Sequence, residues 1–390
     1  MEAEQSVLVR VSGQDRPGII ADLLSLLASA GATVSDIEQV VVRDHLTLCV
    51  LVTVPTGRDL IKELLLFGWE RKIEVDFEVV SAPAKQTTDH HVVTVLGTEL
   101  SPALLAEATG AIAAAGANID RIVRLSKYPV WSYEFLIDGG DFPKLQETLV
   151  ELASQRPIDV AIQPGGLVRR AARLVVLDMD STLIQNEVID LLADEAGCGE
   201  AVAKLTEQAM TGEVDFTDSL RERVALLAGQ PESIIERAKE RLVLTRGTRT
   251  FTRTLRRLGY RIAVNSGGFT HFTDHLAAEL DIDHAHANLL EIRDGVITGE
   301  LLGPVVDRRR KAELLRQIAE AEDVPLAQVV AVGDGANDLD MLAAAGLGIA
   351  FNAKPAVNDA ADASLRVPFL DAILFLLGVT REEIEAADAS

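Results

Sequence analysis

The sequence predicts an α/β protein: a doubly wound, parallel-sheet domain with a small helical cap, preceded by two ferredoxin-like βαββαβ units. A weak internal repeat predicts the two units, because SVLVRVSGQDRPGIIADLL and HVVTVLGTELSPALLAEAT begin similar stretches. From Leu174 onwards, short continuous apolar runs alternate with long helical segments, which is the pattern of parallel strands covered on both faces. A chain of 390 residues is long enough for roughly two or three domains.

Each repeat begins with a β-branched strand and a helix of Ala, Leu and Ile. The helix runs to Gly31 in the first copy and Gly116 in the second, a residue type at which helices commonly stop. Two further strands, a second helix and a fourth strand complete the βαββαβ order. The third strands are expected at 46–54 and 130–137, and the fourth strands at 73–80 and 158–163.

The expected domain boundaries follow from changes in this rhythm. Residues from about 188 to 245 have a helical pattern and interrupt the first strand–helix crossover of the parallel domain, so they are expected to form its cap. The carboxyl ends of the strands are where such sheets bind ligands. The boundaries are 1–82 for the first unit, 88–166 for the second and 172–390 for the parallel-sheet domain, with linkers at 81–89 and 163–173.

The composition excludes several classes of partner. A formal net charge of −23 disfavours binding to nucleic acid and to an anionic membrane surface. No apolar run approaches the roughly 20 residues that cross a bilayer, and MEAEQSVLVR lacks the features of a signal peptide. The two cysteines, Cys49 and Cys198, form no disulfide or metal pattern. A cytoplasmic protein with no nucleic-acid or membrane partner is expected.

Two aspartates follow the first strand of the parallel domain. The run LVVL at 174–177 leads into Asp178 and Asp180, and alternation along an extended chain puts both carboxylates on one side. Like charges so close repel each other and raise a pKa, whereas a divalent cation such as Mg²⁺ would remove the conflict. The alternative interpretation is a pair of turn or helix-capping aspartates.

A later strand repeats this arrangement. VVAVGDGANDLDML, residues 329–342, combines an apolar strand with a glycine turn and with Asp334 and Asp338. Two acidic strand ends on one parallel sheet can converge on a single metal ion. A glycine-rich turn before an acidic helix start is the alternative.

Two further features suit a phosphate group. In YRIAVNSGGF, residues 260–269, a strand is expected to end at Ser266, where Gly267 and Gly268 leave backbone N–H groups available. Lys311, in VVDRRRKAELL, would be a counter-charge for a phosphoryl group, although a basic run is usually a solvated face.

In this order, DMDST, SGG, Lys311 and GDGAND resemble the four motifs of the haloacid dehalogenase-like phosphatases. DMDSTLIQNEVID, with Glu187 seven residues after Asp180, and the cap stretch MTGEVDFTDSLRERVALLAG are similar to phosphoserine phosphatases. The resemblance covers about residues 172–380. The two N-terminal repeats resemble ACT domains, and a pair of them before this domain is similar to a subgroup of bacterial phosphoserine phosphatases.

The resemblance implies a role for each motif residue. Asp178 would be the nucleophile that forms an aspartyl-phosphate, and Asp180 the general acid and base. Mg²⁺, with Mn²⁺ as the alternative, would be held by the Asp178 carboxylate, the Asp180 backbone carbonyl and Asp334. Asp338 would orient the metal ligands or Lys311. The residues implied to contact phosphate are Ser266, Gly267, Lys311 and Asn337.

The resemblance also implies which cap residues recognise the substrate. Glu187 would accept the substrate's ammonium group, Arg223 would pair with its carboxylate, and Met210 and Phe216 would shield the site from water. Taken from the residues alone, Glu187 and Arg223 would be ordinary helix-surface charges.

In the first repeat, DRPGI at 15–19 marks a strand-to-helix turn, where Gly18 allows close approach of a ligand. ACT domains bind amino acids at this turn, so Asp15 and Gly18 are candidates for an L-serine effector site. The second repeat has GTELSPALL instead, without the glycine, so a packing role is equally expected there. The resemblance also implies a homodimer formed through the ACT domains.

The expected function is therefore Mg²⁺-dependent hydrolysis of O-phospho-L-serine to L-serine and phosphate, the last step of L-serine biosynthesis. Three alternatives stay open. One is a related phosphatase acting on another small phosphomonoester. Another is a non-catalytic, amino-acid-sensing regulator. The last is a phosphotransferase that shares the aspartyl-phosphate.

Overall fold

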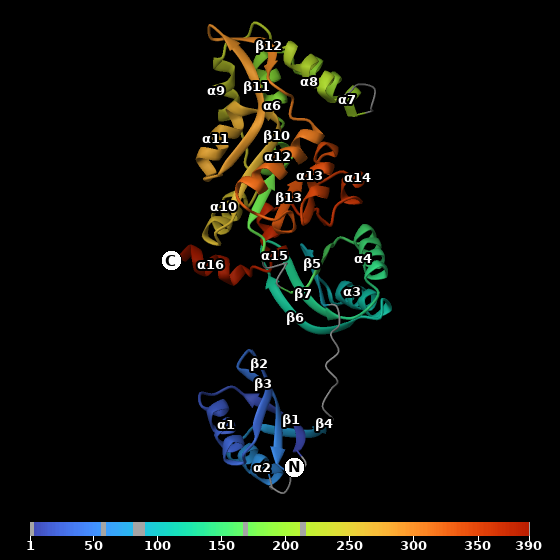
Figure 1. The fold of residues 1–390 in the computed structure, drawn as a ribbon, viewed down its shortest axis with the longest axis vertical. Helices are drawn as coiled ribbons and strands as arrows, with labels where there is room; N and C mark the ends of the chain where they lie inside the picture. Colours follow the sequence, from blue (N-terminus) through green and yellow to red (C-terminus); the bar gives the residue numbers. More distant parts are fainter. Residues whose placement is uncertain (1–3, 56–59, 81–89, 167–170, 211–215, 390) are drawn as a thin grey trace. The chain divides into compact units, whose positions relative to one another are not determined.

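The computed structural model describes residues 4–55, 60–80, 90–166, 171–210 and 216–389 (Figure 1). The chain divides into two compact units, Met1–Thr87 and Thr88–Ser390, and each is described by itself. Among the described residues, no helix is long and apolar enough to cross a membrane.

The first unit is one βαββαβ repeat with a four-stranded antiparallel sheet in the order β2-β3-β1-β4. Alternate residues of the central strands, such as Val9 and Val50, are fully buried in the same core as Leu23 and Leu64 of the two helices. The elements are β1 (Glu4–Gln14), α1 (Ile19–Ser29), β2 (Thr33–Val42), β3 (His45–Pro55), α2 (Leu60–Arg71) and β4 (Glu74–Val80).

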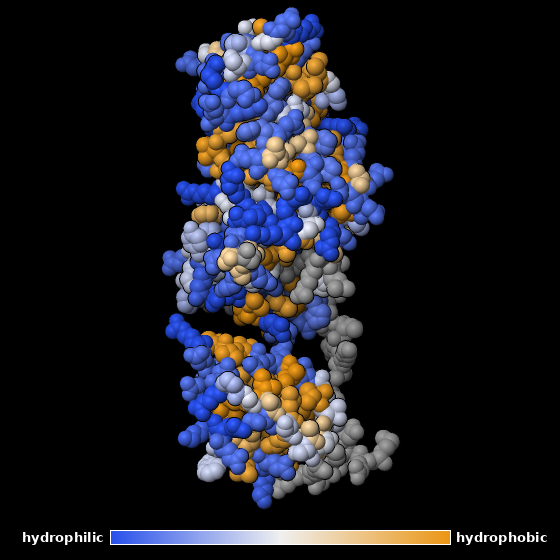
Figure 2. All heavy atoms as spheres, turned by 90° about the vertical axis from the view of Figure 1, so that its left-hand side faces the viewer, coloured by the Kyte–Doolittle hydropathy of each residue, from blue (hydrophilic) through white to orange (hydrophobic). Residues whose placement is uncertain are grey.

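This unit exposes large apolar side chains, most of them on two elements. Every residue of the edge strand β2 is exposed, and the outer side of α2 carries Trp69 with 79% of its surface exposed. Figure 2 shows apolar side chains gathered on the surface of this unit. Large exposed apolar patches commonly mark contact surfaces. The large exposed apolar residues are Val34, Ile37, Val40, Val41 and Val42 on β2, Ile61, Leu65, Leu66 and Trp69 on α2, and Val79 on β4.

The second unit opens with the other repeat, whose strand order β8-β5-β7-β6 matches that of the first. Its first helix starts differently, because Ser101 caps it by accepting a hydrogen bond from the Leu104 N–H, whereas Gly18 with φ 98° begins α1. The elements are β5 (His90–Gly97), α3 (Pro102–Ala114), β6 (Asn118–Ser126), β7 (Trp131–Asp138), α4 (Phe142–Gln155) and β8 (Asp159–Pro164).

The rest of the second unit alternates strands and helices. Its strands are β9 (Leu174–Leu177), β10 (Arg261–Phe269), β11 (His284–Arg293), β12 (Val296–Leu302), β13 (Val329–Gly333), β14 (Leu347–Phe351) and β15 (Ala363–Leu365). Its helices are α6 (Val188–Ala196), α7 (Gly199–Met210), α8 (Phe216–Ala225), α9 (Ser233–Glu240), α10 (Thr248–Arg257), α11 (Thr270–Leu280), α12 (Arg308–Ala321), α13 (Leu339–Ala344), α14 (Pro355–Asn358), α15 (Ile373–Leu376) and α16 (Arg381–Ala389). Single turns lie at Met179–Leu183, Leu326–Gln328, Ala336–Asp338 and Leu370–Ala372.

The sheet confirms the predicted α/β class. Its order here is β12-β11-β10-β9-β13-β14-β15, with β9 central and parallel to both neighbours. Figure 1 shows α10 and α11 on one side of the sheet and α12 and α13 on the other. Each face of β9 accordingly enters a separate core, because Val175 and Leu177 pack with α10 and α11, whereas Leu174 and Val176 pack with α12 and α13.

A hairpin that the sequence did not reveal supports the cap helices. β11 and β12 pair antiparallel, and β12 extends the sheet beyond the parallel strands. The Gly229 N–H, just after α8, donates to the Ile297 carbonyl, and a Cβ at Gly299 would lie 2.9 Å from the Ala228 Cβ. This close packing fixes α8 against the sheet edge.

The second repeat shares its sheet with the parallel domain, where a linker was expected. β15 pairs antiparallel with β8 through Ala363 and Ala161. Beside this pair, Arg366 donates to the buried Asp159 carboxylate at 2.8 Å and to the Ala153 carbonyl near the end of α4 at 2.8 Å. The domain boundaries drawn from the sequence stay predictions, since one sheet runs across the second of them.

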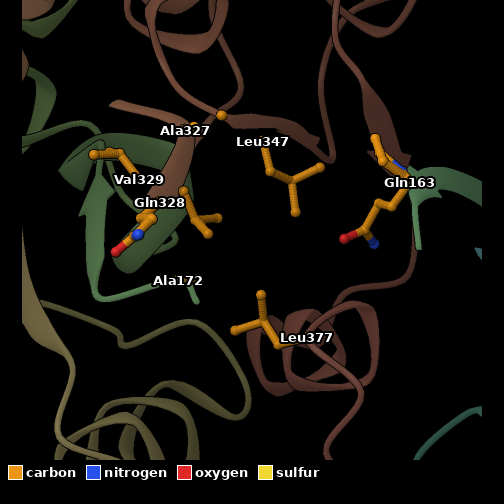
Figure 3. A pocket seen from close by; sticks show the side chains of 10 residues that line it. Gln163, Ala172, Ala327, Gln328, Val329, Leu347 and Leu377 are labelled. Carbon is orange, nitrogen blue, oxygen red and sulfur yellow. The ribbon is translucent and has the colours of Figure 1, made fainter. Parts of the chain in front are cut away.

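The short β15 leaves a cavity of about 110 Å³ between β8 and β14 (Figure 3). Figure 3 shows the Gln163 amide, whose nitrogen donates to the Leu376 carbonyl at 2.9 Å, together with Leu347 and Leu377. The cavity lies at the amino-terminal ends of β13 and β14, where Val329 and Leu347 line it. It is therefore at the opposite end of the strands from the predicted functional aspartates.

Candidate active site

The predicted functional residues meet at the carboxyl ends of three adjacent parallel strands. Asp178 follows the central β9, Ser266 lies in the neighbouring β10, and Asp334 follows β13 on the other side. The Asp178 N–H donates to the Val332 carbonyl at 2.9 Å, which holds the first aspartate against the third strand. Parallel register thus brings residues 156 positions apart in the sequence to one edge of the sheet.

The turn after β9 directs the two aspartates. The Asp178 carboxylate accepts a hydrogen bond from the Met179 N–H at 2.7 Å. Ser181 has φ 56°, in the left-handed region that non-glycine residues rarely adopt. The Asp180 carboxylate accepts from the Val188 N–H at 2.8 Å and from the Ser266 hydroxyl at 3.3 Å. Its side chain therefore points toward β10, leaving Asp178 nearer to β13.

Lys311 is buried between two carboxylates. Its Nζ atom lies 2.8 Å from the Asp178 Oδ1 atom and 2.8 Å from the Asp338 Oδ1 atom, and its side chain has no exposed surface. Burial lowers the pKa of the ammonium group, but the two carboxylates outweigh it and raise the pKa above its usual value. Lys311 is consequently a permanent cation at the centre of the site.

The acidic groups are held above their ordinary pKa. Burial, followed by the charge of Asp338, raises the pKa of Asp178 well above its usual value. Burial and the charge of Glu187 raise the pKa of Asp180 to about 8. Burial and Asp338 raise the pKa of Asp334 to about 7. A pKa of about 8 lets Asp180 keep a proton at neutral pH, as a general acid requires.

The donor set fits a divalent cation. Carboxylate oxygens of Asp178, Asp334 and Asp338 all lie within 4.8 Å of one another. Asp338 is already engaged, because its two oxygens accept from Lys311 at 2.8 Å and from the Gly335 N–H at 3.0 Å. The carboxylates of Asp178 and Asp334 remain available as oxygen donors, and a bound cation would favour their ionised forms. The Thr182 hydroxyl donates to Asp334 at 3.1 Å and orients it.

The predicted phosphate loop, residues 266–268, departs from the expected strand end. β10 does not stop at Ser266 but continues to Phe269, with its ladder to β11 interrupted after Asn265. The interruption is a bulge, which turns backbone groups out of the sheet. A Cβ at Gly268 would lie 2.7 Å from the Val188 side chain and 2.8 Å from the Asp180 Oδ2 atom. Any larger residue would have to displace these side chains, so glycine lets the chain lie directly against Asp180.

The GDGAND turn also depends on a close approach. A Cβ at Gly333 would lie 2.4 Å from the Asp338 Cγ atom, so glycine at this position allows Asp338 to fold back toward Lys311. Asn337 is half-buried in the single turn Ala336–Asp338.

Two extended segments connect the cap to the sheet. Ile184 and Leu244 form an antiparallel bridge, and the Asn186 side chain accepts from the Val243 N–H at 2.7 Å. Glu187, directly before α6, accepts a hydrogen bond from the Ser181 hydroxyl at 2.7 Å. Partial burial of its carboxyl group raises the pKa of Glu187. This residue therefore lies next to the turn that carries Asp180.

Arg223 on α8 is buried, with 8% of its surface exposed. Its guanidinium donates to the Ser219 carbonyl at 3.2 Å and to the Thr206 hydroxyl at 3.5 Å, both neutral groups. Burial lowers the pKa of Arg223, and the charges of Asp190 and Glu187 partly offset this effect. A buried arginine with neutral partners has capacity for a carboxylate.

The structure brings the motif residues together as follows. Asp178, Asp180, Ser266, Lys311, Asp334 and Asp338 form one cluster through the contacts given above, and Glu187 is joined to it through Ser181. Gly267, in the irregular end of β10, follows Ser266 of this cluster, and Asn337, in the turn Ala336–Asp338, precedes Asp338. The side chains of Met210 and Phe216 lie outside the described residues.

Asp15 and Gly18 belong to the first unit and line a depression there, together with Arg16, Pro17, Ile20, Ala21 and Leu24.

Sequence reasoning missed two residues that organise the site. Thr182 lies within the quoted DMDST motif, where its spacing from Asp178 was the available signal. Asn288 on β11 is buried and donates to the Gly267 carbonyl at 2.8 Å. A single asparagine in HAHANLLEIR gives no signal of this contact, which depends on the pairing of β10 with β11.

Comparison with known families gives three matches. Residues 175–343 match the haloacid dehalogenase-like hydrolases. Residues 5–78 and 89–163 each match an ACT domain family.

The chain is similar along nearly its whole length to named enzymes. It is 51% identical to a phosphoserine phosphatase of Streptomyces coelicolor, covering 98% of this chain and 94% of that protein. It is 47% identical to a phosphoserine phosphatase of Mycobacterium tuberculosis, covering 100% of this chain and 97% of the other. A solved structure of a phospho-aspartyl intermediate analogue of phosphoserine phosphatase aligns with a TM-score of 0.50 and 43% identity, covering 52% of this chain and 98% of that one.

Proposed function

The chain belongs to the phosphoserine phosphatases of the haloacid dehalogenase-like hydrolases, and on that premise we propose that it hydrolyses O-phospho-L-serine with Mg²⁺ through an aspartyl-phosphate on Asp178. The observation that carries the proposal is the Asp178 carboxylate, 2.8 Å from the buried Lys311 ammonium and beside Asp180, whose pKa is about 8. The solved relative with a phospho-aspartyl intermediate analogue supports the same intermediate.

In the first step, an Asp178 oxygen attacks phosphorus, and the bond from phosphorus to the serine oxygen breaks. Asp180 gives its proton to that leaving oxygen, so the serine side chain leaves as a neutral hydroxyl group. The raised pKa of Asp180 keeps this proton available near neutral pH. The Ser266 hydroxyl, 3.3 Å from the Asp180 Oδ2 atom, lies where it can contact the transferring group.

In the second step, water attacks the aspartyl-phosphate and Asp180, now ionised, takes a proton from it. The acyl-phosphate bond breaks, phosphate leaves, and Asp178 is restored as a carboxylate. Lys311 keeps its charge throughout and offsets the negative charge of the phosphoryl oxygens in both steps. Asp180 ends the cycle protonated, as it began.

Asp178, Asp334 and the backbone carbonyl of Asp180 would hold the Mg²⁺ ion, and Asp338 would keep Lys311 and the Gly335 turn in place. When bound, the ion supplies charge neutralisation for the phosphoryl oxygens and the nucleophile.

Substrate selection would rest on the cap. Glu187 would accept the ammonium group of phosphoserine, and Arg223 would pair with its carboxylate. The buried Arg223 donates hydrogen bonds to neutral groups, so a substrate without a carboxylate would leave this cation without a hydrogen-bonded counter-charge. Phosphoethanolamine, which lacks only that group, should therefore be a poor substrate.

Phosphate release from a panel of small phosphomonoesters, with and without Mg²⁺, tests the function. We expect phosphoserine to be hydrolysed faster than any other ester and activity to be lost on chelation and restored by Mg²⁺. Removal of the ion takes away a charge that favours the ionised forms of Asp178 and Asp334, whose pKa values are raised without it. Another preferred ester would make the chain a related phosphatase, and full activity in chelator would contradict the metal requirement.

The matched control for this assay compares two arginines of α8. Arg223→Lys should reduce the preference for phosphoserine over phosphoethanolamine by about 10- to 100-fold, the range for loss of a charged hydrogen-bond pair. Arg221→Lys, at an exposed position of the same helix, should leave that preference unchanged. Equal effects of the two changes would refute the role of Arg223.

The depression around Asp15 and Gly18 is the proposed site for an L-serine effector. Gly18 has φ 98°, so Gly18→Ala should strain the turn and raise the serine concentration for half-maximal effect by about tenfold. Gly31→Ala is the control, because Gly31 has φ 70° in the same unit and lies outside the depression. Initial rates in increasing L-serine measure the effect, and equal shifts in both variants would place the effector elsewhere.

The exposed apolar edge strand β2 supports a homodimer formed through the ACT domains. Light scattering would test this association: we expect twice the 41.9 kDa mass of one chain, whereas a monomer at micromolar concentration would contradict it.

A further inference from the structure

The bulge of the phosphate loop leaves backbone groups without ladder partners. Asn265 pairs with His286 and Phe269 with Asn288, so residues 266–268 of β10 stand opposite the single residue Ala287 of β11. Backbone oxygens inside a protein need a hydrogen-bond donor, and this ladder no longer supplies one at the bulge.

The Asn288 side chain supplies a hydrogen-bond donor at the bulge. Its Nδ2 atom donates to the Gly267 carbonyl at 2.8 Å, its Oδ1 atom accepts from the Val306 N–H at 2.8 Å, and the residue is 2% exposed. Val306 precedes Asp307, which caps the helix that carries Lys311. One buried amide therefore ties the phosphate loop to the start of the lysine helix.

Asn288 can influence the reacting groups through a single peptide plane. The Gly267 carbonyl and the Gly268 N–H belong to the same rigid peptide, so fixing the oxygen also fixes the direction of the N–H. The Gly268 N–H donates to the Ser266 hydroxyl oxygen at 2.8 Å, and this hydroxyl donates to the Asp180 Oδ2 atom at 3.3 Å. A change in the orientation of this peptide plane would therefore move the Ser266 hydroxyl relative to Asp180.

We propose that Asn288 is a positioning residue for phosphoryl transfer: through the 267–268 peptide, its amide sets the direction of the Ser266 hydroxyl at the general acid. The proposal rests on the proposed function. Among the described residues, Glu187 and Arg223 of the cap form no hydrogen bond with Asn288, so binding of the serine part should not depend on it.

The test compares Asn288→Asp and Asn288→Leu with a control, Gln163→Leu. The control also removes a buried amide that donates to a backbone carbonyl, Leu376, but at the opposite end of the sheet. For both Asn288 variants we expect kcat to fall about 10- to 100-fold, the effect of a small misplacement of reacting groups, with KM within about threefold of the parent value. Gln163→Leu should lower the melting temperature with kcat within about twofold of the parent.

The pH dependence separates positioning from packing. In Asn288→Asp, the ionised carboxylate repels the Gly267 carbonyl, whereas the protonated form donates to it again. Burial raises the pKa of such a carboxyl group, so the ratio of variant to wild-type kcat should rise as the pH falls. The corresponding ratio for Asn288→Leu should stay flat.

Loss of kcat no larger than in Gln163→Leu, or a flat ratio for Asn288→Asp, would overturn the positioning role. These ratios are measured on whichever phosphomonoester the wild-type protein hydrolyses best. A failure of the phosphoserine proposal in the wild-type panel is thereby distinguished from a failure of this inference.

Discussion

Asp178→Asn is expected to reduce phosphoserine hydrolysis by at least about 10⁴-fold, as removal of a nucleophile does in other enzymes with covalent intermediates. The amide has no negative charge with which to attack phosphorus and is a weaker metal ligand. Measured phosphate release would decline, and no acid-stable or trapped phosphoenzyme should form on mixing with substrate. Near wild-type rates in this variant would overturn the covalent mechanism.

The fold should survive this substitution. Asparagine has nearly the shape of aspartate, and Lys311 keeps its contact with Asp338 at 2.8 Å. The melting curve of Asp178→Asn is the control, because a collapse of the fold would remove activity for a trivial reason. We expect binding of phosphoserine to persist, which a titration by calorimetry would detect.

Lys311→Met should both inactivate and destabilise the protein. The change leaves Asp178 and Asp338 buried without the cation that contacts each of them at 2.8 Å. Removing one partner of a buried ion pair typically costs about 3–5 kcal/mol of unfolding free energy. Activity should fall by at least about 10³-fold, since the phosphoryl oxygens lose their permanent counter-charge. Denaturant unfolding and phosphate release measure the two effects.

The loss of stability in Lys311→Met should depend on pH. The pKa of Asp178 is already raised in the folded protein, and loss of the lysine raises it further. A carboxyl group with a raised folded pKa stabilises the fold below its unfolded pKa of about 3.9 and loses this contribution as the pH rises through the folded value. The difference between wild type and Lys311→Met should therefore shrink as the pH is lowered toward 4.

The control for this prediction is Lys239→Met. Lys239 pairs with Glu236 at 2.8 Å on the surface of α9, where Glu236 is 73% exposed. Surface pairs of this kind contribute about 0–1 kcal/mol, so stability should change little and activity should not change. An equally small loss of stability in Lys311→Met would contradict the buried arrangement at the centre of the site.

Several features of the fold could be predicted because they are local in the sequence. The βαββαβ order of both repeats followed from β-branched runs and from the glycines at helix ends, Gly31 and Gly116. The parallel strands at Leu174 and Val329 followed from short apolar runs. Strand β12 was missed because VITGELL in a hairpin carries no motif, and its place depends on the cap helices that pack on it.

The residues of the candidate site likewise fall into those that the sequence predicted and those that it did not. Asp178, Asp180, Ser266, Lys311 and Asp334 stand in motifs whose residue types already suit a metal and a phosphate group. The end of β10 was misplaced at Ser266, because a bulge can be distinguished from a strand end only when the partner strand is known. Thr182 and Asn288 have no role until β13 and β11 bring them partners.

The sequence by itself determined which residue types stand at the candidate site: acidic strand ends, a glycine turn and one lysine in a fixed order. Those are properties of residue types and spacing, which the chain carries before it folds. Tertiary structure alone decided that Lys311 lies between Asp178 and Asp338, that Asp180 faces Ser266, and that β8 joins β15. The reason is that pKa and hydrogen bonding depend on distance and burial, which arise only when distant segments pack together.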